Sequence, residues 1–127
     1  NGLVVRVIRD ADRKGIAAIA TEMGDLSQLA RSGKLGAEQM RGGCFTVSSL
    51  GGIGGGHFTP IINAPEVAIL GVGKAAIEAS WDGAAFVPRL QLPLSLSWDH
   101  RAVDGAEAGR FLAYLVSLLA DFRRVSI

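Results

Sequence analysis

The sequence contains a single cysteine, Cys44, and only two histidines, His57 and His100. One cysteine excludes an intrachain disulfide, and because Cys44 lies in an apolar stretch we expect a buried, reduced thiol. The histidines and the cysteine do not have the spacing of metal ligands, which argues against a metal site.

Neither sign of charge is in clear excess. The sequence has 13 lysines and arginines and 12 aspartates and glutamates, which gives a formal net charge of +1. The basic residues are dispersed, which argues against a nucleic-acid partner. Apolar runs are interrupted well short of membrane length, and no signal peptide or lipidation motif is visible. We therefore expect a cytosolic or organellar-matrix protein, with no membrane partner.

Glycine is abundant, with 17 residues, and its densest run is Gly51–Gly56. The run does not match a dinucleotide-binding motif, because His57 stands where the third glycine is required. Neither Gly-Lys pair of the sequence has the flanking residues of a P-loop. Two interpretations stay open: a flexible or closely packed loop, or a loop whose bare backbone a cofactor arm or a neighbouring subunit can approach.

The first third of the chain has the pattern of a strand followed by a helix. Residues 3–8 form an apolar run typical of a buried strand. Apolar residues at helical spacing predict a helix over residues 14–32, which Asp10 or Asp12 could cap and Gly33 could end. A short helical turn is expected over residues 36–41.

The rest of the chain alternates strands with turns and ends in a second helix. Strands are predicted over residues 45–50, 67–72 and 89–98, with a hairpin turn at Trp81-Asp82-Gly83. Helical spacing returns over residues 105–124. We read this order, in a chain of one-domain length, as an α/β fold of two layers: a mixed β-sheet with helices packed on it.

The strongest candidate for a catalytic site lies in residues 92–111, where a strand with alternating apolar residues leads into the second helix. His100 lies between them, in the pattern His-x-x-x-Asp-Gly. A lone histidine beside Trp98 is most often structural. Here Asp104 can cap the helix, and Gly105 permits a close approach of backbone. The pattern therefore predicts a turn of defined shape between the strand and the helix, which we call the corner. A general base is easily positioned at such a corner.

This stretch, DHRAVDGAEAGRFL, resembles the signature of the dihydrolipoyl acyltransferases, the core enzymes of 2-oxo acid dehydrogenase complexes. GLVVRVIRDAD, CFTVSSLGGIGG, FTPIINAPEVAILGVGKA and LPLSLSWDHR are similar to successive blocks of that family's catalytic domain. The resemblance implies a chloramphenicol acetyltransferase-like fold. It also implies that residues 1–127 are the C-terminal half of the catalytic domain, without the lipoyl and subunit-binding domains.

The resemblance gives individual residues a role in acyl transfer between dihydrolipoamide and coenzyme A. His100 is the general base. Ser48, which lies 52 residues earlier, is the hydroxyl that stabilises the oxyanion, with Ser49 as the alternative. Asp104 fixes the loop, and Arg101 is an ion-pair partner for Asp104 or for another nearby carboxylate.

Coenzyme A and a lipoyl group carried on a separate domain are the cofactors that the resemblance implies. Ser48, Ser49, Gly71 and Gly73 are the residues expected to bind them. The glycine run is then better explained as a loop that a cofactor arm or a neighbouring subunit approaches.

The family resemblance also implies partners: a homotrimer that assembles into a larger core and binds the other subunits of the complex. His100 of one protomer would face Ser48 of another. The sequence is most similar to the acetyl-transferring, pyruvate dehydrogenase branch. A branched-chain acyl transferase, or a catalytically incomplete core or binding fragment, stays open. A Ser-His-Asp hydrolase is disfavoured because no Gly-x-Ser-x-Gly elbow is present.

Overall fold

The computed structural model describes residues 5–50, 56–121 and 123, and it divides into two compact units. One unit comprises residues 1–44 and 113–127, and the other comprises residues 45–112. Each unit is described by itself.

The first unit contains the helix α1, Ile16–Arg31, between two 3₁₀ turns, Ala11–Arg13 and Ala37–Met40. These bounds confirm the predicted helix and the short helical turn. Gly33 adopts a φ of 73°, and the N–H of Lys34 donates to the carbonyl of Leu29 at 2.9 Å, so the predicted stop is confirmed. The predicted cap is wrong: Gly15 precedes the helix, and neither Asp10 nor Asp12 caps it.

Two further predictions for this unit are wrong. Residues 5–8 form no strand, while residues 3 and 4 lie outside the described residues. The Val7 N–H bonds the Gln39 carbonyl at 2.8 Å, which is a loop contact and not part of a strand ladder. Cys44 is exposed, because it lies in the connecting segment before the next strand and does not enter a core.

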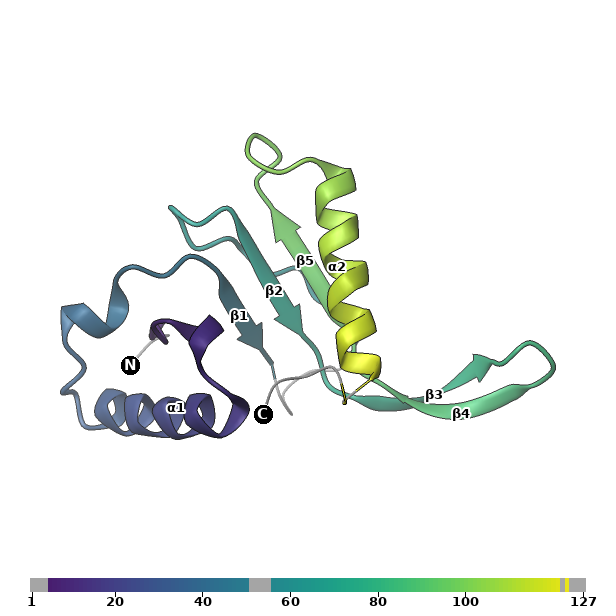
Figure 1. The fold of residues 1–127 in the computed structure, drawn as a ribbon, viewed down its shortest axis with the longest axis horizontal. Helices are drawn as coiled ribbons and strands as arrows, with labels where there is room; N and C mark the ends of the chain where they lie inside the picture. Colours follow the sequence, from purple (N-terminus) through teal and green to yellow (C-terminus); the bar gives the residue numbers. More distant parts are fainter. Residues whose placement is uncertain (1–4, 51–55, 122, 124–127) are drawn as a thin grey trace. The chain divides into compact units, whose positions relative to one another are not determined.

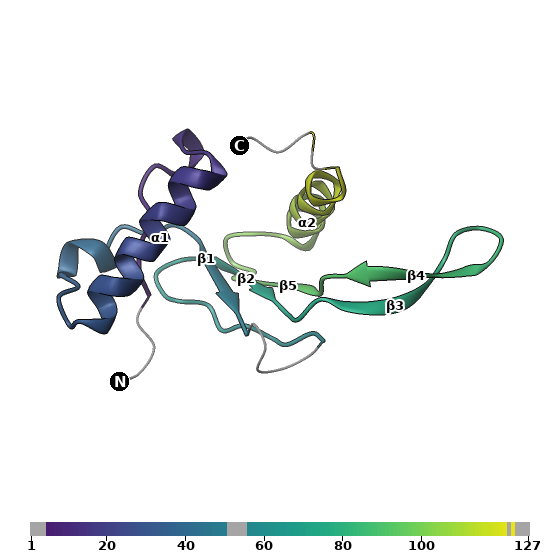
Figure 2. The same cartoon turned by 90° about the horizontal axis from the view of Figure 1, so that it is seen from below.

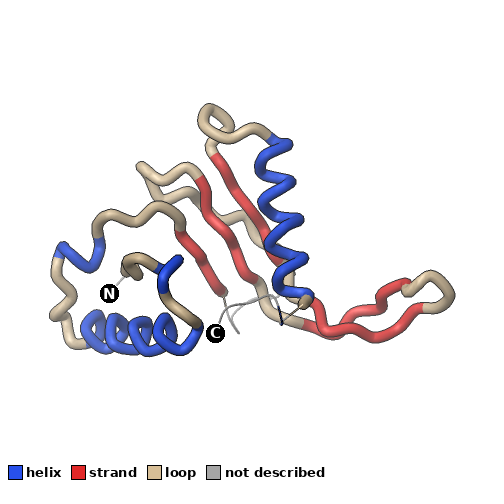
Figure 3. Tube along the Cα trace, in the orientation of Figure 1, coloured by secondary structure: helices blue, strands red, loops and turns tan. Residues whose placement is uncertain are grey.

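The second unit is built on a three-stranded sheet in the order β1-β2-β5 (Figures 1 and 3). Its strands are β1, Thr46–Ser49, β2, Ala68–Val72, and β5, Leu94–Trp98. β1 runs parallel to β2, and β5 runs antiparallel to β2. The predicted mixed sheet is therefore confirmed.

A hairpin of β3, Ala76–Trp81, and β4, Phe86–Gln91, connects β2 to β5. The predicted turn is confirmed: the Asp82 carboxylate accepts the N–H groups of Ala84 and Ala85, both at 2.8 Å. The single long strand predicted over residues 89–98 is wrong. The chain leaves β4 at Leu92-Pro93, and the Pro93 carbonyl accepts the Gly73 N–H at 2.9 Å. Proline has no N–H to continue a ladder, so the strand divides there.

The helix α2 extends over Gly105–Ala120 and ends earlier than predicted. Its first turns lie over one face of the sheet (Figure 2), where the rings of Phe45 and Phe111 have centroids 5.7 Å apart. The second unit buries Ile69 and Leu70 of the central strand and Ala108 of this helix.

The opposite face of the sheet is covered in part by residues 56–60. The Ser97 hydroxyl donates to the Pro60 carbonyl at 2.8 Å. A Cβ on Gly71 would lie 2.8 Å from Cζ of Phe58, so only glycine permits this approach. The two faces of the sheet therefore differ: a helix covers one, and an irregular segment lies on the other.

Candidate active site

His100 lies in the turn that joins β5 to α2, and it is exposed. Its ring lies beside the indole of Trp98, with ring centroids 5.9 Å apart. The adjacent backbone is tied to the sheet, because the Asp99 N–H donates to the Val67 carbonyl at 2.7 Å. The predicted base is thus presented to solvent from a fixed corner.

Asp99 holds this corner through both its backbone and its side chain. The guanidinium of Arg101 donates to the two carboxylate oxygens, with Nη2 to Oδ2 at 2.7 Å and Nε to Oδ1 at 3.0 Å. The N–H groups of Ala102 and Val103 donate to the Asp99 carbonyl at 2.9 and 3.0 Å. The Arg101 hydrogen bonds lower the pKa of Asp99 to about 2, so the carboxylate is ionised at neutral pH.

Of the two partners left open for Arg101, the structure selects Asp99 and not Asp104. Sequence reasoning missed Asp99. The signal that could have found it is an acidic residue two positions before an arginine in a tight turn.

Asp104 caps α2, as predicted. Its Oδ1 accepts the N–H of Glu107 at 2.8 Å, and its carbonyl accepts the N–H of Ala108 at 3.1 Å. This fixes the end of the corner opposite Asp99. Asp104 therefore acts on the backbone in this structure, and its carboxylate stabilises the helix N-terminus.

The two candidate serines of β1 lie on opposite faces of the sheet. Ser48 pairs with Gly71, and Gly71 pairs with Ser95, so these three residues share the face on which residues 56–60 lie. Ser49, one residue on, belongs to the face of α2. Ser48 is half-buried, whereas Ser49 is exposed.

A second histidine, in the segment of residues 56–60, contacts this row of the sheet. Nδ1 of His57 and the hydroxyl of Ser95 are 3.2 Å apart and share a hydrogen bond. No motif in the sequence links His57 to a partner, so the sequence did not reveal this contact. The pairing depends on strand register, which no local pattern encodes.

Gly71 and Gly73, both predicted to bind the cofactor, are buried under residues 56–60. A Cβ on Gly73 would clash with the Gly56 carbonyl oxygen at 2.1 Å. In this structure residues 56–60 of the same chain lie against the backbone of both glycines. The rest of the glycine run, residues 51–55, lies outside the described residues.

His100 and Ser48 are not brought together within one chain. Ser48 shares its row with Ser95, and Trp98 lies three residues further along β5. That separation is about 10 Å along the strand, and two interstrand spacings of about 4.8 Å add to it across the sheet. His100 lies beyond Trp98, so a single thioester does not reach both side chains in one protomer.

Comparison with known proteins identifies the family. A family model described as the 2-oxoacid dehydrogenases acyltransferase catalytic domain matches residues 1–127. The chain belongs to this family. Among curated acyltransferases it is 66% identical to the dihydrolipoyllysine-residue acetyltransferase component of the pyruvate dehydrogenase complex of Cupriavidus necator, over 98% of this chain and 23% of that protein. The corresponding protein of Haemophilus influenzae is 58% identical, over 98% of this chain and 22% of its own length.

Solved acyltransferase structures have the same fold. The Azotobacter vinelandii dihydrolipoamide acetyltransferase, studied for the role of a serine, a histidine and an asparagine in its catalytic mechanism, matches with a TM-score of 0.93 and 60% identity. The cubic core of a pyruvate dehydrogenase multienzyme complex matches with a TM-score of 0.93 and 61% identity. Each match covers 96% of this chain and 50% of the solved chain. The chain thus spans about a quarter of its curated relatives and half of these solved chains, and it has the chloramphenicol acetyltransferase-like fold of the acyltransferase family.

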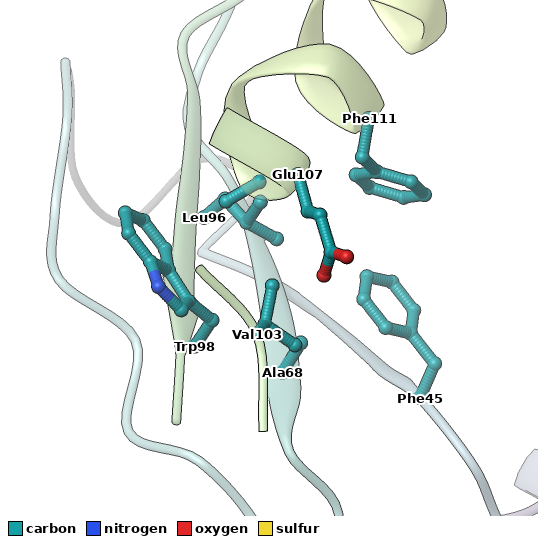
Figure 4. Close-up of a pocket in the computed structure, with 8 residues that line it drawn as sticks. Phe45, Ala68, Leu96, Trp98, Val103, Glu107 and Phe111 are labelled. Atoms are coloured by element: carbon teal, nitrogen blue, oxygen red, sulfur yellow. The ribbon is translucent and has the colours of Figure 1, made fainter. Parts of the chain in front are cut away.

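The chain also carries a pocket of about 270 Å³ between the sheet and the start of α2 (Figure 4). Its lining is apolar except for Glu107, and it includes none of the predicted site residues. The lining residues are Phe45, Ala68, Leu96, Trp98, Val103, Glu107, Ala108 and Phe111.

Two features are absent from the described part of the chain. No group of three or more His, Cys, Asp or Glu side chains there could hold a metal ion. Across the same residues, neither helix has the length and apolarity needed to cross a membrane.

Proposed function

We propose that this chain forms part of an acyltransferase that moves an acetyl group between dihydrolipoamide and coenzyme A. The proposal rests on two separations along the sequence, from serine to histidine and from histidine to the residue four positions later. In the Azotobacter vinelandii enzyme the studied serine precedes the histidine by 52 residues, and the asparagine follows the histidine by four. Ser48, His100 and Asp104 have the same two spacings in a chain of the same fold.

In the proposed reaction, His100 is the general base. A thiol is a weak nucleophile until it is deprotonated, and a neutral imidazole can accept its proton. The coenzyme A sulfur then bonds to the thioester carbonyl carbon, and a tetrahedral oxyanion forms. When the oxyanion collapses, the bond from carbon to the dihydrolipoamide sulfur breaks, and the imidazolium returns its proton to that sulfur.

Ser48 is the proposed donor to the oxyanion. A hydroxyl held in place contributes most where negative charge develops in the transition state. Two observations favour Ser48 over Ser49: its spacing from His100, and its place on the face with Ser95 and His57, away from α2. Coenzyme A and the lipoyl arm remain the proposed ligands, at the face of the sheet where residues 56–60 cover Gly71 and Gly73.

Asp104 and Asp99 are proposed as positioning residues. Asp104 stands where the relative has an asparagine by spacing, and both side chains can accept a helix N–H. A role shared by aspartate and asparagine is that of a hydrogen-bond acceptor, which supports capping of α2 over proton transfer.

We further propose that the complete site forms between copies of the chain. The separation of His100 and Ser48 in one protomer supports a site to which one copy contributes the base and another contributes the hydroxyl. A homotrimer that builds a larger core is the proposed assembly, in keeping with the cubic core formed by a relative that is 61% identical. Within a 2-oxo acid dehydrogenase complex of the bacterial cytoplasm or mitochondrial matrix, this core would bind the other subunits.

The proposed activity is tested by incubating the chain with S-acetyl-dihydrolipoamide and coenzyme A and following acetyl-coenzyme A. A longer form that spans the whole catalytic domain of the relatives is assayed in parallel. Transfer by the longer form alone identifies this chain as a catalytically incomplete core fragment. Thioester hydrolysis that does not require coenzyme A would contradict acyl transfer and favour a hydrolase. Branched-chain thioesters in the same assay test the alternative acyl group.

A further inference from the structure

The imidazole of His100 has no polar partner that holds its ring in one orientation. Among the described residues, no hydrogen bond or ion pair joins this ring to another group. The two neighbouring carboxylates are engaged elsewhere, because Asp99 binds Arg101 and Asp104 accepts the N–H of Glu107. Where a histidine acts as a base, a carboxylate commonly orients the ring. An exposed ring without such a partner changes rotamer within nanoseconds, so its direction would vary.

The contact that the structure provides instead is the indole of Trp98. The ring centroids of Trp98 and His100 are 5.9 Å apart, and the ring planes meet at 40°. Tilted aromatic pairs at about this separation attract each other. An indole also attracts a positive charge within about 6 Å, and an imidazole becomes positively charged when it accepts the proton of a thiol. The same neighbour therefore suits the base before and after proton transfer.

Trp98 is itself fixed by the sheet. It pairs with Ala68 of β2, and with Leu96 it lines the pocket between the sheet and α2 (Figure 4). The residue is half-buried, and its Nε1 is buried without a hydrogen-bond partner among the described residues. Apolar packing therefore holds the indole in place, and no polar contact of the indole N–H contributes.

We infer that Trp98 is a positioning residue for His100. Its ring restricts the imidazole to one direction and stabilises the imidazolium that forms when the thiol is deprotonated. The inference rests on the proposed function, in which His100 is the general base. Asp99 and Asp104 fix the backbone of the corner, and Trp98 fixes the ring that the corner presents.

Two residues of β5 offer a matched pair of variants for the test, in a form that spans the whole catalytic domain. Trp98→Leu removes the ring contact, whereas Leu96→Ala removes bulk from the same pocket two residues earlier. We expect Trp98→Leu to lower kcat by about three- to tenfold, with the KM of coenzyme A and of the acetyl donor changed by less than about twofold. Leu96→Ala should lower the thermal midpoint but keep kcat within about twofold of the wild type.

Trp98→Phe is the conservative variant. It keeps an aromatic ring beside His100 and removes the unpaired indole N–H, so we expect a kcat close to that of the wild type. Wild-type kcat in a folded Trp98→Leu chain would overturn the inference. A loss of kcat in Leu96→Ala as large as that in Trp98→Leu would also overturn it, because the loss would then come from packing in general.

A second measurement reports the ring contact without any activity. The sequence has two tryptophans, so Trp81→Phe leaves Trp98 as the only one. A charged imidazole in contact with an indole quenches the indole fluorescence. We expect the emission of this chain to fall as pH decreases from about 8 to 5, the range in which histidines become charged. The fall should vanish in His100→Asn and remain in His57→Asn, and a fall that survives His100→Asn would contradict the contact.

The two measurements keep this inference separate from the proposed activity. A wild-type long form that transfers no acyl group, but shows quenching that depends on His100, supports the ring contact and counts against the acyltransferase. Acyl transfer with a kcat indifferent to Trp98→Leu does the reverse.

Discussion

At the scale of single residues, the proposed role of His100 as a base depends on how firmly the surrounding backbone is held. Asp99 fixes the beginning of the corner through Arg101 and the backbone, and Asp104 fixes its end through the first turn of α2. The imidazole itself stays exposed between them. A base that must reach a substrate thiol needs this combination of a rigid backbone and an open ring.

Replacing His100 should abolish most of the turnover without unfolding the chain. In a form that spans the whole catalytic domain, we expect His100→Asn or His100→Ala to lower kcat by about 10²- to 10⁴-fold, because the thiol loses its proposed general base. The circular dichroism spectrum and thermal midpoint should stay close to those of the wild type, since the ring is exposed. Turnover that survives the substitution would show that another group accepts the proton.

The two serines of β1 allow a matched comparison. Ser48→Ala should lower kcat by roughly 10²- to 10³-fold, the usual effect of removing one oxyanion donor. Ser49→Ala, one residue away on the opposite face, should leave kcat within a fewfold of the wild type. The reverse order of effects would assign the oxyanion role to Ser49.

The ion pair of Asp99 and Arg101 makes a prediction about acid. Arg101 lowers the pKa of Asp99 to about 2 in the folded chain, whereas an unfolded aspartate titrates at about 3.9. The pair therefore adds stability above about pH 4, and that contribution is lost as pH falls toward 2. Urea unfolding should show the wild type more stable than Arg101→Gln at pH 6, with most of the difference lost near pH 2. A difference that does not change with pH would contradict this.

At the scale of the secondary-structure elements, α2 depends on its cap. Asp104→Ala should lower the free energy of unfolding by about 1 kcal/mol, because the N–H of Glu107 loses its acceptor. Asp104→Asn should keep most of that stability and most of the activity, since an amide oxygen can accept the same hydrogen bond. Strong loss of kcat in a stable Asp104→Asn chain would show that the carboxylate has a charged role in the reaction.

Elements with a strong period were predictable from the sequence, and elements that depend on distant partners were not. Helical spacing predicted α1 and α2, and Asp82-Gly83 predicted the hairpin turn. The division at Leu92-Pro93 was missed, because apolar alternation continues through it while the pairing partner changes from β3 to β2. The strand expected over residues 3–8 failed for a related reason: a strand requires a neighbour, which its own sequence does not specify.

The candidate site was predictable to a similar degree. Asp104 could be read as a helix cap from local sequence alone. The assignment of Ser48 depended on family resemblance, and the place of Ser48 beside Gly71 and Ser95 needed the register of three strands. The contact of His57 with Ser95 was invisible to sequence reasoning because 38 positions separate the two residues.

At the scale of the whole molecule, the chain leaves much of its apolar surface uncovered. Only four hydrophobic side chains are buried among the described residues, whereas large hydrophobics from β1 to α2 are exposed. Exposed apolar surface on this scale is typical of a surface that further protein covers, and the chain spans only half of the solved chains that it matches. The separation of His100 and Ser48 supports the proposal that the working unit contains more than one copy.

Complementation between two inactive variants tests this conclusion most directly. His100→Ala and Ser48→Ala forms that span the whole catalytic domain are mixed in equal amounts, dissociated, reassembled and assayed for acetyl-coenzyme A. If base and hydroxyl come from different copies, about a quarter of the sites in a randomly mixed assembly receive both intact groups. We therefore predict recovery of about a quarter of wild-type activity. A reassembled mixture as inactive as its two components would contradict a site shared between copies.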